Sequence, residues 1–192
     1  MMLSERLKEE TQSLHDAIEQ NPFMAKMQNN SFNHEDYKDL LVLFYGLHHM
    51  AEGQLGEYEE LNMPLRERTS CIEADLKELG CCEMHMHKSC DTDLELKIDT
   101  LSKAYGALYV LEGSRMGGMF LTKMIRSQLG SAIPVSYFEG FKEKTPAYVS
   151  EFKEFLNEKE VIINAKECIQ CAKDMFVFVN YLFTRSVNTI SN

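Results

Sequence analysis

The apolar stretch Ala104–Ile125 places the strongest constraint on the fold of this chain. Its residues favour a buried helix, yet Gly113, Gly117 and Gly118 lie in its middle. A glycine inside a helix costs about 0.5–1 kcal/mol relative to alanine, so three glycines need a compensating contact. Gly113 and Gly117 share one helix face, with Gly118 at its edge. The contact is either a closely packed second helix or a flat ligand lying on bare backbone.

Helical periodicity extends over the rest of the chain. No segment alternates between apolar and polar residues for long, and proline and glycine fall at the expected helix ends. We therefore expect an all-α fold of about seven or eight helices, with residues 1–192 forming a single domain. The expected helices are Glu5–Gln20 with Ser4 as its cap, Phe23–Gln28, a long helix from Asn33 to about Glu60, Leu65–Leu79 opened by Pro64, a segment from Asp91 or Thr92 through Ile98 into the glycine stretch, Ala147–Asn157 capped by Thr145, and Ala165–Val187.

The balance of charges argues against two classes of partner. The formal net charge is −10, whereas binding to nucleic acid or to an anionic membrane surface needs a basic face. No apolar run reaches the roughly 20 residues that a membrane-spanning helix needs. Six cysteines without a recognisable signal peptide favour a reducing compartment. We therefore expect a cytoplasmic protein without a disulfide framework.

The segment Cys81–Cys90 is the one stretch with the composition of a metal site. It holds three cysteines and two histidines within ten residues. Their spacing does not match the paired motifs of a structural zinc site, so a surface connection with reduced thiols is the favoured interpretation. Adventitious metal binding by these side chains is the alternative.

His15 is the other residue that could bind a ligand. It lies beside the apolar stripe of the first expected helix, and Glu19 follows it by one helical turn. A neutral imidazole is the usual axial ligand of haem iron, and its second ring nitrogen normally donates to a carboxylate or a carbonyl. An ordinary histidine on an amphipathic helix fits the same position, so His15 alone does not decide between the two.

Taken together, these two regions resemble the haem oxygenase family. The segment Thr11-x-x-x-His15-x-x-x-Glu19 resembles the proximal helix of these enzymes. The segment Tyr109-Val-Leu-Glu-Gly113-Ser-Arg-Met-Gly117-Gly118 is similar to their distal helix, especially that of the bacterial members. The order and approximate lengths of the helices also match, almost from end to end.

The resemblance implies a role for each motif residue. Haem would lie between the two helices, with His15 binding the iron and Glu19 orienting its ring. The distal residues would bring backbone against the porphyrin; they are Gly113, Ser114, Gly117 and Gly118. Animal members carry an aspartate directly after the first glycine, where this chain has Ser114, so the proton relay is open between Ser114 and Arg115.

Further residues are assigned to the ligand by the same resemblance. Lys8, two turns before His15, and Lys153 would bind the haem propionates, and the alternative for each is a solvated surface charge. Tyr109, Met116 and Phe176 would line the pocket, although ordinary core packing explains them as well.

The implied reaction is the cleavage of haem at a meso carbon to biliverdin, CO and Fe²⁺. Haem would be both substrate and cofactor, and O2 and an electron donor such as ferredoxin, flavodoxin or a flavin reductase would be needed. A monomer is expected. Two alternatives stay open: a haem carrier or redox sensor with the same pocket, and a helical protein of similar fold without haem.

Overall fold

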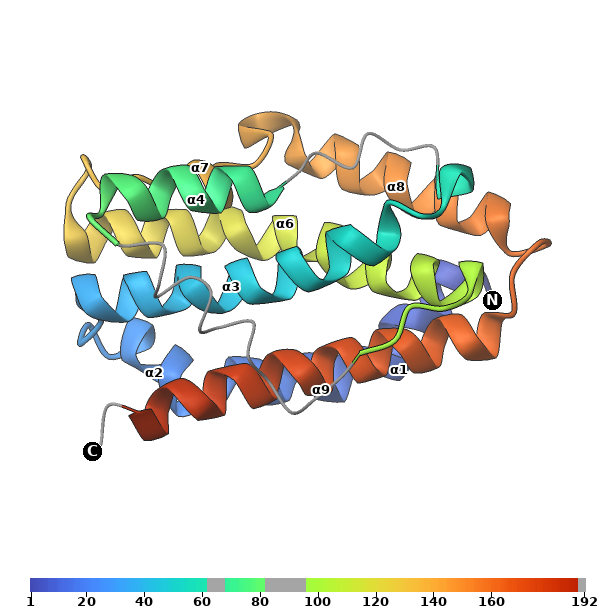
Figure 1. Cartoon of the computed structure of the whole chain (residues 1–192), viewed down its shortest axis with the longest axis horizontal. Coiled ribbons are helices and arrows are strands. Elements are labelled where there is room, and N and C mark those ends of the chain that lie inside the picture. The colour runs from blue at the N-terminus through green and yellow to red at the C-terminus, as the bar shows by residue number, and fades with distance from the viewer. Residues whose placement is uncertain (62–67, 82–95, 190–192) are drawn as a thin grey trace.

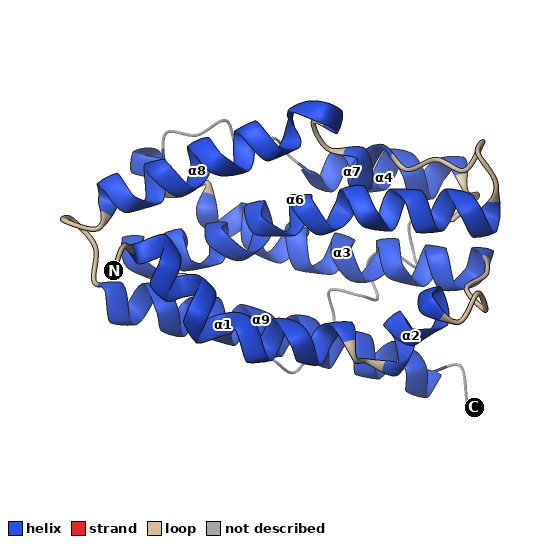
Figure 2. Cartoon of the chain, turned by 180° about the vertical axis from the view of Figure 1, so that it is seen from behind, coloured by secondary structure: helices blue, strands red, loops and turns tan. Residues whose placement is uncertain are grey.

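The computed structural model of the chain describes residues 1–61, 68–81 and 96–189, and every regular element in these ranges is a helix (Figures 1 and 2). The predicted all-α fold is confirmed. No helix in the described ranges is long and apolar enough to cross a membrane. The elements are α1 (Leu3–Glu19), α2 (Pro22–Gln28), α3 (His34–Leu55), η1 (Glu59–Leu61), α4 (Arg68–Glu78), α6 (Leu101–Leu129), α7 (Ser136–Glu139), η2 (Lys142–Lys144), α8 (Thr145–Lys159) and α9 (Ala165–Thr189).

Helix α9 packs most extensively against α6 and α1, and α6 also packs against α3, α7 and α8. Helices α6 and α9 approach closely at Gly106 of α6, where an added Cβ would lie 2.2 Å from the Cys168 carbonyl oxygen and 3.1 Å from the Cys171 Cβ. No side chain fits there, so this glycine lets the two helices meet backbone to backbone. Glycine therefore serves helix packing near the start of α6.

Helix α1 begins at Leu3, two residues earlier than expected, and Ser4 is not its cap. The Leu3 amide donates to Glu160 Oε2 at 3.1 Å, and the Ser4 amide donates to Asn157 Oδ1 at 2.9 Å. Free amides at a helix start must find acceptors, and here residues at the end of α8 supply them. The contact also fixes the start of α1 beside the end of α8.

The expected continuation of helix through Ile98 is wrong, because α6 begins at Leu101 with the Thr100 side chain as its cap. The Gln54 side chain of α3 accepts from the Ile98 amide at 2.8 Å and donates to the Leu96 carbonyl at 3.1 Å. These two bonds replace the bonds that a helix would provide and hold the segment extended along α3. The expected restart at Asp91 or Thr92 lies outside the described residues.

Two other predicted boundaries also move, and one helix was not expected. Helix α3 ends at Leu55 rather than near Glu60, and a short 3-10 helix follows it. Thr145 is the first residue of α8 and not a side-chain cap, with Pro146 in the first turn. Helix α7 was not expected; Asp75 of α4 supports its start by accepting from two of its backbone amides at 3.0 and 2.9 Å. The expected start of α4 at Pro64 lies outside the described residues.

Candidate functional site

Helix α6 has an exposed face on which two of the positions are glycines. Gly113 and Gly117 are both exposed, and a Cβ added to either would have no neighbour within 4 Å. Met116 and Phe120 lie on the same side of the helix, and 44% and 64% of their surfaces are exposed. We call these four residues the bare face of α6. Packing does not account for the glycines here, because no part of the described chain covers them.

Gly118 has different surroundings and does not belong to the bare face. It is buried, and an added Cβ would lie 2.8 Å from the carbonyl oxygen of Phe138 in α7. The expectation that Gly118 borders the same strip as Gly113 and Gly117 is not met, because it points toward α7. Its missing side chain allows close packing, which was the alternative explanation for all three glycines.

The bare face looks toward α1, as the contact of Tyr109 indicates. Tyr109 precedes Gly113 by one turn on the same face, and its hydroxyl lies beside the Thr11 side chain of α1. Burial raises the pKa of the Tyr109 phenol, and the neighbouring Thr11 side chain opposes this change. Helices α1 and α6 run in the same direction (Figure 1). Gly113 on α6 and His15 on α1 therefore both lie one turn beyond the Tyr109–Thr11 contact.

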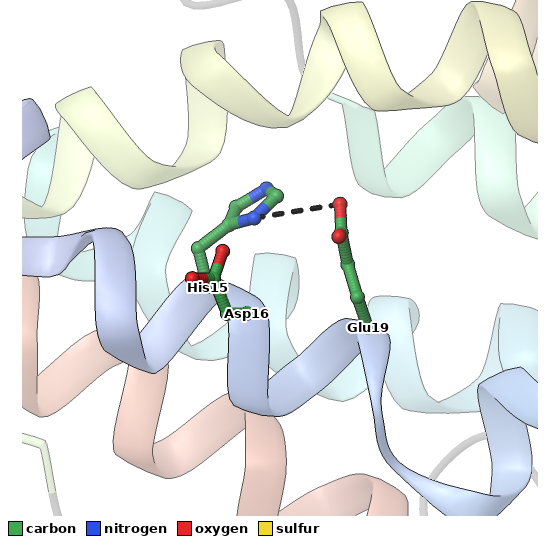
Figure 3. A group of neighbouring side chains, drawn as sticks. All are labelled: His15, Asp16 and Glu19. Atoms are coloured by element: carbon green, nitrogen blue, oxygen red, sulfur yellow. Dashed lines mark ion pairs between the residues drawn. The ribbon is translucent and has the colours of Figure 1, made fainter.

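The His15 imidazole is half exposed and is oriented from within α1. Its Nδ1 lies 3.5 Å from Glu19 Oε1, and 51% of the side chain is accessible. Figure 3 shows both side chains rising from α1 toward the ribbon of α6. When Nδ1–H donates to Glu19, Nε2 carries the lone pair, which is the arrangement of a metal-binding histidine with a carboxylate partner.

Two neighbours complete the surroundings of His15. Its ring makes an edge-on contact with Phe176 of α9, with 5.9 Å between the ring centroids. Asp16 lies next to it in the chain, and one ligand atom from each of His15, Asp16 and Glu19 falls within 4.8 Å of the others (Figure 3). The predicted ligand His15 and the predicted wall residue Phe176 are thus brought together.

The two predicted lysines lie on the helices that meet at the start of α1. Lys8 follows Ser4 by one turn on α1, and Lys153 precedes Asn157 by one turn on α8. Ser4 and Asn157 are joined by the hydrogen bond described above, so the two lysines stand one turn away from the same contact. Both lysine side chains are exposed. Two exposed cationic groups therefore lie near the contact of α1 with α8.

Neither candidate for the proton relay is free to serve as a donor toward the bare face. The Ser114 hydroxyl donates to the Leu111 carbonyl at 2.7 Å. Arg115 is buried, forms a two-point ion pair with Glu112, and stacks on the rings of Phe141 and Tyr148. Arg115 thus faces the interior beside α7 and α8, and its expected position near a ligand is wrong.

A buried polar network behind α6 was missed from the sequence. His48 of α3 is 1% exposed; its Nε2 lies 2.9 Å from the Tyr137 hydroxyl and its Nδ1 lies 3.3 Å from Glu52 Oε1. Burial lowers the pKa of His48, and the hydrogen bond with Glu52 opposes this change. A signal existed: His48 and Glu52 have the same four-residue spacing as His15 and Glu19.

The thiols of α9 give no support to a redox site. Cys168 and Cys171 are free and buried against α6, and burial raises their pKa values to about 12 and about 11. They therefore stay protonated at neutral pH and act as small apolar side chains. All of the segment Cys81–Cys90 beyond Cys81 lies outside the described residues.

The imidazole on α1 and the uncovered glycines on α6 give this all-α chain the two features that a site for a flat ligand between helices would need. A family model described as Heme oxygenase matches residues 1–185. The chain belongs to the haem oxygenase family, and the predicted enzyme class is confirmed. No curated protein sequence matches the chain at a significant level.

Solved structures share the fold over almost the whole chain. The haem oxygenase of Neisseria meningitidis, in its NO- and CO-bound forms, is 26% identical, with a TM-score of 0.77 over 96% of this chain and 92% of that chain. The haem oxygenase of Leptospira interrogans is 17% identical, with a TM-score of 0.79 over 96% of this chain and 100% of that chain. Haem oxygenase-1 of Synechocystis, in complex with haem, is 15% identical, with a TM-score of 0.74 over 96% and 92%.

Proposed function

We propose that this haem oxygenase binds haem between α1 and α6 and cleaves it at a meso carbon to biliverdin, CO and Fe²⁺, with O2 and electrons as co-substrates. One observation carries the proposal: the His15 imidazole of α1 stands one turn beyond the Tyr109–Thr11 contact, opposite the open backbone of Gly113 and Gly117. A porphyrin needs a flat, apolar, unfilled surface opposite its iron ligand, and the bare face of α6 has these properties.

Each residue near this surface has a task that follows from its chemistry. His15 Nε2 is the iron ligand, and Glu19 accepts from Nδ1–H, which fixes the ring and makes the imidazole a stronger ligand. Met116 and Phe120 would be covered by the porphyrin and would exclude water from its distal side. The bound haem supplies the oxygen-activating iron, whereas the protein supplies position and hydrogen bonds.

The edges of the ligand are assigned to residues around this surface. Lys8 and Lys153 would pair with the two propionates, because both are exposed cations beside the contact of α1 with α8. Tyr109 and Phe176 would form walls, since one contacts Thr11 and the other contacts the His15 ring. Gly118 is left out of this assignment because it packs on α7.

The proposed setting is a monomer in the cytoplasm that receives electrons from a separate protein such as ferredoxin, flavodoxin or a flavin reductase. The described cysteines Cys71, Cys81, Cys168 and Cys171 carry free thiols.

The proposal predicts that His15→Ala abolishes normal haem ligation and turnover. Wild-type protein, His15→Ala and the control His34→Ala, which alters an exposed histidine at the start of α3, are titrated with haem. The Soret band is recorded first, and a reductant is then added under O2. We expect bilin absorption to replace the Soret band in the wild type and the control, but not in His15→Ala.

The outcomes separate the alternatives. A stable Soret band in the wild type after reduction under O2 would indicate a carrier or sensor rather than an enzyme, and no Soret band at all would indicate a helical protein without haem. An unchanged haem spectrum in His15→Ala would remove His15 as the ligand.

A further inference from the structure

A second buried arginine, Arg68 of α4, reaches the glycine segment of α6 from behind. It is 6% exposed, and its Nη1 donates to the Leu111 carbonyl and to Ser114 Oγ, both at 3.4 Å. Its Nη2 donates to the Tyr137 carbonyl at 3.1 Å. The guanidinium therefore connects α7 to the turn of α6 that contains Gly113.

Two side chains donate hydrogen bonds to the Leu111 carbonyl oxygen, which lies within α6. The Ser114 hydroxyl donates to it at 2.7 Å, and Arg68 donates to the same oxygen. A serine that bonds back to the carbonyl one turn earlier bends a helix, and a neighbouring glycine makes the bend easier. Helix α6 bends along its length (Figure 1). The extra donors therefore act on the turn from which Gly113 and Gly117 face α1.

Arg68 itself is held from both ends by a closed ring of contacts. Its backbone amide donates to Glu52 Oε1 at 2.8 Å, and Glu52 lies 3.3 Å from His48 Nδ1. His48 Nε2 lies 2.9 Å from the Tyr137 hydroxyl, and the Tyr137 ring lies under the Arg68 guanidinium at 4.2 Å. A buried polar network in which each member has a partner fixes one arrangement. The position of the guanidinium is thus set by two other helices, α3 and α7.

We propose that Arg68 is a positioning residue for the haem-facing turn of α6. It holds Leu111 and Ser114 in place, and with them the backbone at Gly113 and Gly117, against which the substrate would lie. This inference rests on the proposed function. Arg68 acts through the helix and does not touch the ligand, and Ser114 takes part through its bond to Leu111 rather than by giving up a proton.

The test compares Arg68→Met and Arg68→Lys with Arg126→Met. Arg126 also lies on α6, but its partner is Glu139 at 2.7 Å, away from the glycine turn. Amide hydrogen exchange of the protein without haem is followed at residues 114–118, and haem affinity, bilin yield and bilin isomers are then measured. The exchange experiment gives a readout that does not depend on activity.

We expect Arg68→Met to speed exchange at residues 114–118 at least tenfold relative to the rest of α6. Haem affinity should stay within threefold of the wild type, whereas the rate of bilin formation should fall at least tenfold and more than one isomer should form. Arg68→Lys should restore part of the isomer selectivity, because it keeps the charge and one donor. Arg126→Met should resemble the wild type.

Wild-type exchange and a single isomer in a folded Arg68→Met protein would overturn the inference, as would an equal effect of Arg126→Met. If Arg68→Met does not fold, Arg68→Lys decides by the same measurements. A wild-type protein that forms no bilin would refute the proposed function, and the exchange data would still decide whether Arg68 holds the turn.

Discussion

Gly117 and Gly118 are neighbours in the chain but have opposite surroundings. The first has open space where its Cβ would be, and the second has the Phe138 carbonyl at 2.8 Å. The same residue type therefore leaves an open surface at one position and allows close helix packing at the next. The stability of the protein without haem separates these two roles.

We predict that alanine changes the free energy of unfolding in opposite directions at these two positions. Gly117→Ala should stabilise the protein without haem by about 0.5–1 kcal/mol, because alanine favours the helix and the new methyl group meets nothing. Gly118→Ala should destabilise it by about 1–3 kcal/mol, because α7 must move. Urea unfolding of both variants measures the difference, and changes of the same sign would contradict the assignment.

A second residue-scale prediction concerns pH. Burial lowers the pKa of His48, and the groups around it are Glu52 on its own helix, Arg68 of α4, Tyr137 of α7 and Glu112 of α6. The unfolded chain, in which histidine titrates near pH 6.5, therefore binds more protons than the folded one just below that pH. The contribution of His48 to stability is complete above about pH 6.5 and is lost as the pH falls through its lower folded value.

His48→Gln tests this assignment, because glutamine keeps a polar partner for Tyr137 but does not titrate. The free energy of unfolding of the wild type should decrease more steeply between pH 6.5 and pH 5 than that of the variant. Urea unfolding at several pH values measures both slopes. Equal slopes would mean that His48 does not titrate as its burial implies.

At the scale of elements, the contact between α6 and α9 depends on Gly106. We predict that Gly106→Ala destabilises the protein by about 2–3 kcal/mol, because the methyl group would lie 2.2 Å from the Cys168 carbonyl oxygen and the helices must separate. Gly53→Ala is the matched control, since a Cβ there meets nothing within 4 Å, and it should be neutral or slightly stabilising. Thermal and urea unfolding measure both, and a neutral Gly106→Ala would contradict the backbone contact.

The helices could be predicted from periodicity, but several of their ends could not. Apolar spacing depends on local sequence, whereas an end depends on which distant group accepts or donates the free backbone bonds. Asn157 and Glu160 extend α1 back to Leu3, and Gln54 keeps Ile98 out of α6. These partners are far away in the chain, so no local pattern indicates them.

Part of the candidate site could be predicted because it depends on local sequence alone. The four-residue spacing of His15 and Glu19 places both on one face of α1, and that spacing is local. The surroundings of Gly118 and Arg115 depend on where α7 and α8 lie, and no local pattern in the sequence indicates the positions of these two helices. The closed ring of contacts around Arg68 joins α3, α4 and α7 behind α6, so only the folded chain reveals it.

At the scale of the whole molecule, a ligand that binds only the folded state raises its stability. With free haem at 100 times its dissociation constant, the gain is about 2.7 kcal/mol, or about 5–10 °C in Tm for a chain of this size. Differential scanning fluorimetry with and without haem measures the shift. We expect His15→Ala to lose most of it, and an equal shift in that variant would mean that the stabilisation comes from another site.

Helices α1 and α6 are each packed on α9 far more than on one another. The width of the space between them is therefore set by a third helix, which supports both walls from the same side. A larger or smaller side chain on α9, at a position other than Phe176, would change the separation of α1 and α6 without altering His15 or the glycines. Adapting this scaffold to a bulkier macrocycle is thus a matter of redesigning α9, the element that carries none of the reacting groups.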